Sequence, residues 1–79
     1  MRPYEAEYPE GTIVRVATRD YLLRFARDWK LHNPLAKSQI EFAGAVAAIA
    51  EVGFYHGGDV VYRLEGLPGT WHQQCLSRA

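Results

Sequence analysis

The chain has one cysteine, no surplus of either charge and no long hydrophobic run, and each shortage excludes a class of protein. A single cysteine, Cys75, cannot form an intrachain disulfide or supply a cysteine-rich zinc site. No stretch approaches the roughly twenty apolar residues of a membrane-spanning helix. The start, MRPYEAEYPEG, has no apolar run after its charge, which argues against a secretory signal. We therefore expect a soluble, cytoplasmic protein without membrane association.

The charge balance disfavours nucleic acid as a partner. Nine basic and nine acidic residues cancel, whereas sequence-independent binding to phosphates usually needs a basic surplus. Basic residues do gather in the first half of the chain, at Arg15, Arg19, Arg24, Arg27, Lys30 and Lys37. Acidic residues interleave with them, so this region is interpreted as a mixed, solvated surface.

What the chain does contain is typical of a folded globule. It has 79 residues, 48% of them hydrophobic, with three Phe, two Trp and five Tyr. This length predicts a single domain over residues 1–79, with residues 1–11 as an extended lead-in. So short a chain has barely enough core to fold alone, which makes self-association a reasonable expectation.

The first half predicts a strand followed by a helix. Residues 12–16, TIVRV, favour a strand because they are β-branched and partly alternating, and Ile13 is expected to point inward with one of its neighbours. Thr18 is a suitable cap for a helix over residues 19–31, which Asn33 and Pro34 would end. Its apolar face is predicted from helical spacing to contain Leu22, Phe25, Ala26 and Trp29.

The second half predicts a hairpin. Gly57 and Gly58 lie between apolar and aromatic residues, a strong turn signal. We expect a helical turn over residues 38–42, where Ser38 begins a capping-box pattern, then strands over 45–55 and 60–65. A continuous helix over 39–52 is the alternative, because alanines favour it. A turn over 66–69 and a closing element over 71–76 return the chain to the core.

This order resembles an SH3-like antiparallel β-barrel: a GTIVRV strand, an inserted segment, a glycine-led GAVAAI strand, a hairpin to VYRLEG and a short last strand. Within that group, residues 11–76 are most similar to the β-subunit domain of nitrile hydratase, which has a comparable insertion. The residues that carry the likeness are His32, Pro34, Phe42, Gly44 and Ile49. The resemblance implies a small barrel with one inserted helix between the first two strands; the alternative is an α+β fold with two helices and a hairpin.

The resemblance implies no reaction and no cofactor on this chain. In that family the partner α subunit holds the metal, and the present sequence has no thiolate cluster. A likeness of fold does not transfer function. No catalytic residue, metal or cofactor is therefore expected.

Three small groups of residues nevertheless suggest chemistry. His56 and Asp59 flank the two glycines and could act as a base and its carboxylate, although a hairpin tip explains them as well. His72 and Cys75 are three residues apart, which on a strand puts them on opposite faces and disfavours a nucleophile–base pair. His32 follows the last turn of the predicted helix, where the helix dipole accounts for it.

Exposed aromatics have the best functional prospects. The predicted binding surface comprises Tyr55, His56, Asp59, Trp71 and His72, and Tyr4, Tyr8, Tyr21 and Tyr62 are further aromatic candidates. The sequence thus favours a non-enzymatic interaction module that binds a protein partner or self-associates. The alternatives are a small-ligand binder or enzyme with a pocket at an oligomer interface, using His56, Asp59 and His72, and an RNA-binding barrel.

Overall fold

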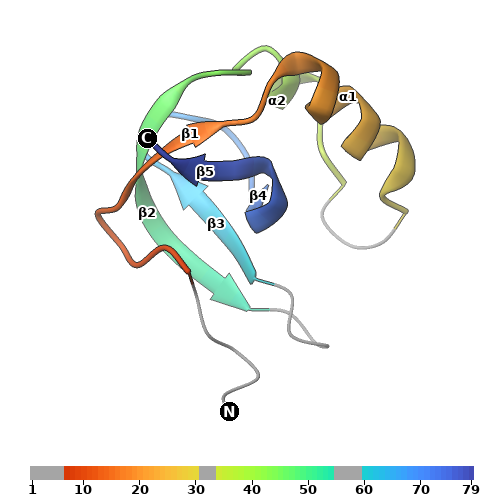
Figure 1. Cartoon of the computed structure of the whole chain (residues 1–79). Coiled ribbons are helices and arrows are strands. Elements are labelled where there is room, and N and C mark those ends of the chain that lie inside the picture. Colours follow the sequence, from red (N-terminus) through yellow and green to blue (C-terminus); the bar gives the residue numbers. More distant parts are fainter. Residues whose placement is uncertain (1–6, 31–33, 55–59) are drawn as a thin grey trace.

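The computed structural model describes residues 7–30, 34–54 and 60–79, which form an antiparallel sheet with helices beside it (Figure 1). The elements in chain order are β1 (Ile13–Val16), α1 (Arg19–Asp28), α2 (Lys37–Ile40), β2 (Val46–Phe54), β3 (Val60–Leu64), β4 (Trp71–His72), the 3-10 turn η1 (Gln73–Cys75) and β5 (Leu76–Arg78). The strands lie in the order β4-β3-β2-β1-β5. Both α1 and α2 fall between β1 and β2, where the sequence predicts an inserted helix.

The predicted small antiparallel β fold is confirmed, but a closed barrel is not seen. Every pair of neighbouring strands is antiparallel. Among the described residues the two outer strands, β4 and β5, do not pair with each other. The sheet is therefore open and consists of five strands within the described part of the chain.

β2 joins the two halves of the sheet. Its first residues pair with β1, Val46 opposite Arg15, and its later residues pair with β3, Phe54 opposite Val60. The register shifts between Ile49 and Glu51, and such irregularities bend a strand; Figure 1 shows β2 strongly curved. The alternative helix over residues 39–52 is therefore wrong, and the predicted return strand is confirmed.

The inward face of β1 differs from the prediction. Val14 and Val16 are buried, with 0% and 1% of their surface exposed, whereas Ile13 is 49% exposed. Alternate strand residues point to opposite faces, so burying Val14 and Val16 turns Ile13 and Arg15 outward. The prediction for Ile13 is wrong. Ile13, Val14 and Val16 all suit a strand, and their apolar character alone does not say which face of the strand is buried.

α1 begins where the sequence predicts and ends earlier. The Tyr21 backbone N–H donates to Thr18 Oγ1 at 3.3 Å, which satisfies one of the free donors of the first turn. The sequence predicts an end at residue 31, but Trp29 already leaves helical geometry, at φ −82° and ψ 116°. Its ring stacks on that of Phe25, with centroids 5.3 Å apart, so side-chain packing accompanies the early end.

α2 is held by a buried glutamine instead of the predicted serine cap. The helix begins at Lys37, and Ala36 occupies the capping position. Gln39 is 3% exposed. Its Oε1 accepts from the Ala36 N–H at 2.8 Å, and its Nε2 donates to the Thr70 carbonyl at 2.9 Å. One side chain therefore caps α2 and ties it to the loop before β4.

Trp71 is fully buried and belongs to the hydrophobic core. The same core contains buried residues from the strands and from α1, including Val14, Leu22 and Leu64. The chain before β1 is attached by Tyr8, whose N–H donates to Tyr62 Oη and whose hydroxyl donates to the Leu76 carbonyl, both at 3.3 Å. The predicted return of Trp71 and Leu76 to the core is confirmed.

Candidate functional site

Two residues of the predicted binding surface, Trp71 and His72, are buried. Tyr55, His56 and Asp59 lie outside the described residues. Trp71 and His72 are 0% and 1% exposed, respectively, because both belong to the two-residue strand β4, which is buried throughout. Their rings therefore belong to the buried interior and not to the surface.

Other aromatic candidates are buried as well. Tyr8 and Tyr62 are 5% and 0% exposed, and their rings contact each other with centroids 5.6 Å apart. Tyr62 Oη donates to Gln73 Oε1 at 2.6 Å. These hydrogen bonds explain how phenol groups are accommodated inside a small core. Tyr4 lies outside the described residues, as does His32.

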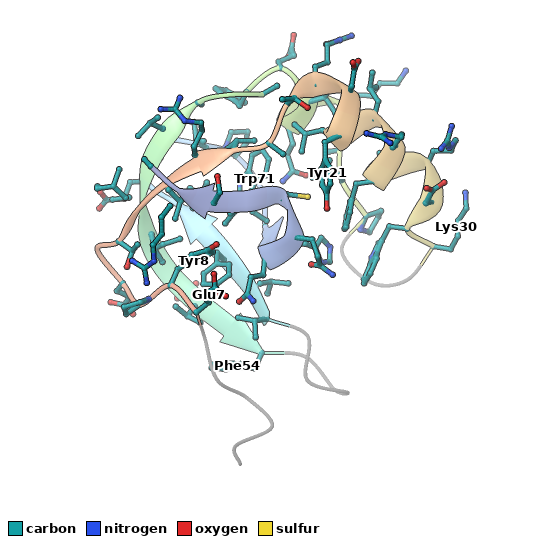
Figure 2. The ribbon with its side chains drawn as sticks, viewed as in Figure 1. Glu7, Tyr8, Tyr21, Lys30, Phe54 and Trp71 are labelled. Atoms are coloured by element: carbon teal, nitrogen blue, oxygen red, sulfur yellow. The ribbon has the colours of Figure 1, made fainter. Side chains whose placement is uncertain are left out.

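Among the aromatic candidates that the structure describes, Tyr21 reaches the surface, with 37% of its area exposed. It borders a hollow of about 310 Å³ on α1, lined by Tyr21, Arg24, Phe25, Asp28 and Trp29. These positions recur every three or four residues, so they share one face of the helix. We call this hollow the α1 groove. In Figure 2 the Tyr21 side chain extends from α1 toward the strands, whereas Lys30 points away from the sheet.

The floor of the α1 groove is a stacked aromatic pair supported from below. The rings of Phe25 and Trp29 are inclined by only 13° to each other. The buried imidazole of His72 contacts both, at centroid distances of 5.0 Å to Phe25 and 4.6 Å to Trp29. His72 thus has a defined position beneath the groove, which the sequence did not indicate, because β4 and α1 are far apart in the chain.

The α1 groove is bordered by one basic and one acidic residue, Arg24 and Asp28, within a segment rich in charge. Residues 19–30 contain four basic and two acidic side chains, all exposed: Arg19, Arg24, Arg27, Lys30, Asp20 and Asp28. Arg27 Nε donates to Asp28 Oδ1 at 3.0 Å. This hydrogen bond, and the charges of Arg27, Lys30 and Arg24, lower the pKa of Asp28 from its ordinary value. The positive surplus of this segment is local, because the whole chain is neutral.

Cys75 is not suited to nucleophilic chemistry. Its side chain is fully buried, and burial raises the pKa of the thiol to about 12. A reactive cysteine needs the opposite shift, because the thiolate is the nucleophile. Within the described residues, no group of three or more His, Cys, Asp and Glu side chains is placed to hold a metal ion.

The sequence contained a signal for the groove that its interpretation missed. Tyr21, Phe25 and Trp29 are spaced four residues apart, an aromatic stripe along one side of a helix. Helical spacing places Phe25 and Trp29 on the apolar face of the helix, and both are half-buried. Partial burial allows Phe25 to pack on the core and Trp29 to pack on His72 while both rings line the groove.

Comparisons with known proteins add no relative: no family model, curated protein or solved structure matches the chain. No helix in the described ranges is long and apolar enough to cross a membrane.

Proposed function

We propose that this chain is a non-enzymatic interaction module that binds a protein partner through the α1 groove. The observation that carries the proposal is the groove itself, an aromatic-lined hollow whose floor is fixed by contacts from beneath. The site differs from the surface expected around Tyr55 and Trp71, but the class of function is the same.

The physical support is preorganisation. Aromatic side chains have few rotatable bonds, and those of Phe25 and Trp29 already pack on each other and on His72. A partner therefore meets apolar surface that loses little further freedom on binding. Tyr21 adds a hydroxyl beside an apolar ring, the combination enriched where proteins bind each other.

At the level of fold, we propose that the sheet is of the SH3-like type, including its likeness to the nitrile hydratase β-subunit domain. The bent strand β2, which pairs with β1 at one end and β3 at the other, supports this assignment. A bend of this kind curls a small sheet toward a barrel. The assignment carries no catalytic role with it.

The test is selection of ligands from a displayed library of random peptides. We expect the protein to enrich a family of peptides, and Tyr21→Ala to weaken the enriched peptides about ten-fold or more, as truncation of an interface anchor does. Trp29→Ala is a second variant at the groove floor. Circular dichroism of each variant separates lost binding from lost folding.

Phe54→Ala is the matched control. Phe54 is also an exposed aromatic, with 47% of its area accessible, but Figure 2 shows it at the end of β2, well away from Tyr21 and α1. We expect this variant to bind as the parent does. An empty selection, or equal losses for Tyr21→Ala and Phe54→Ala, would contradict the proposed function.

A further inference from the structure

We infer that the α1 groove recognises an acidic protein segment that carries a large apolar or aromatic anchor residue. The inference rests on the proposed function and specifies the chemistry of the partner. It is drawn from the shape of the groove and from the charges that border it.

The shape favours one extended segment. The groove runs along α1 from Tyr21 to Trp29, eight residues apart, or roughly 12 Å at the rise of an α-helix. About four residues of an extended peptide span that distance. A volume of about 310 Å³ is at the lower end of ligand pockets, so it accommodates an anchor side chain on the aromatic floor.

The charges favour an acidic partner. Asp28 lines the groove, but its carboxylate is engaged by Arg27 at 3.0 Å. Arg24 also lines the groove, and no ion pair joins it to another residue in the described part of the chain. Arg19, which lines a separate hollow, and Lys30, two residues past the end of α1, add positive charge only at longer range. A peptide carboxylate beside the groove therefore meets a favourable potential.

The same charges disfavour a cationic ligand. Aromatic floors attract cations through the faces of their rings. Here the surplus of basic residues over 19–30 opposes that attraction, because the one acidic residue of the groove is already paired. The groove thus combines an apolar floor with an anion-attracting rim.

The test uses synthetic ten-residue peptides and fluorescence anisotropy. Four peptides are compared: glutamates around a central Trp, the same with Gln for Glu, the same with Lys for Glu, and the glutamate peptide with Ala for Trp. We expect the acidic Trp peptide to bind tightest. Its affinity should decrease as the NaCl concentration is raised from 50 to 500 mM, because added salt screens exposed charges.

Charge reversal at the groove supplies the residue-level evidence. Arg24→Glu should lower the affinity for the acidic Trp peptide by roughly three- to ten-fold, the range expected for a charge at the rim of an interface. Arg63→Glu, at an exposed arginine of β3, is the control and should leave the affinity unchanged. Tyr21→Ala should weaken the acidic and neutral Trp peptides alike.

Each other outcome overturns the inference. Equal binding of the acidic and neutral Trp peptides, lost in Tyr21→Ala, removes the acidic partner but leaves the proposed function standing. Binding of none of these peptides, together with an empty library selection, removes both. A single-stranded RNA pool that binds and is weakened by Arg24→Glu would replace the acidic peptide with nucleic acid. A dimer in sedimentation equilibrium that Tyr21→Ala dissociates would make a second copy the occupant.

Discussion

Cys75 shows how strongly the core controls a single side chain. Its thiol is fully buried, and burial raises its pKa to about 12, so almost no thiolate exists near neutral pH. We expect a thiol reagent such as a chromogenic aromatic disulfide to leave the native protein unlabelled at pH 8. In guanidinium chloride the same reagent should label Cys75 fully. Rapid labelling of the native protein would contradict the structure.

Tyr62 makes stability depend on pH at the alkaline end. Burial raises its pKa above the ordinary value of 10.0, partly offset by hydrogen bonds from backbone N–H groups, and burial likewise raises the pKa of Tyr8. A raised pKa in the folded state means that the folded protein holds the proton more tightly than the unfolded chain. The resulting stability is fully present below pH 10 and is lost as the pH rises through the folded-state value.

We therefore expect the free energy of unfolding to fall above about pH 10, measured by urea denaturation from pH 7 to 11. Tyr62→Phe should lessen this dependence. At pH 7 it should cost roughly 1–3 kcal/mol, because Gln73 Oε1 and the Tyr8 N–H lose their partner. Tyr21→Phe, at a partly exposed tyrosine, is the control. A steep alkaline loss that survives Tyr62→Phe and Tyr8→Phe together would count against this account.

At the scale of elements, Gln39 and Gly69 determine how α2 meets the loop before β4. Gly69 has φ +79°, and a Cβ placed there would lie 2.8 Å from the Gln39 side chain. Gly66 has the same φ of +79° but open space around it. The two glycines therefore separate backbone strain from steric conflict.

We expect Gly66→Ala to lower the free energy of unfolding by roughly 1–2 kcal/mol, because alanine is strained in the left-handed backbone conformation. Gly69→Ala should cost more, because it also displaces Gln39 from its bonds to Ala36 and Thr70. In a Gln39→Ala background the difference between the two glycine variants should disappear. Chemical denaturation of the six proteins measures this, and equal costs in the parent background would refute the close contact.

The elements also show what the sequence determined. The hairpin, the start of α1 at Thr18 and the return of Trp71 to the core were predictable, because apolar periodicity, a side-chain cap and turn residues act over a few neighbours. The end of α1 was not, since Trp29 leaves the helix where its ring packs on Phe25 and His72. That contact joins α1 to β4, and local patterns do not report it.

At the scale of the whole molecule, the side of the sheet that faces the core follows from β1. Alternate residues of β1 face opposite sides of the sheet, so burying Val14 and Val16 leaves Arg15 on the outer face. That polar residue was the available signal, whereas the apolar character of Ile13 pointed the other way. Predicting the α1 groove required this arrangement too, because the groove depends on which elements lie beneath α1.

We expect opposite consequences from neighbouring substitutions in β1. Val14→Ala should lower the free energy of unfolding by roughly 1–3 kcal/mol, because it leaves a cavity in the core. Ile13→Thr should change it by only about 0.5 kcal/mol, since Ile13 is half exposed and threonine keeps the β-branched shape. Urea unfolding measures both. A larger loss for Ile13→Thr than for Val14→Ala would mean that the strand is turned over.

The place of His72 beneath the stacked rings gives the protein an internal spectroscopic reporter. Ring currents from Phe25 and Trp29 act on the imidazole protons at centroid distances of 5.0 and 4.6 Å. A ligand that tilts either ring on entering the groove must change those currents. The NMR resonances of the His72 imidazole would then shift when a ligand binds in the α1 groove, without any probe placed on the contact surface.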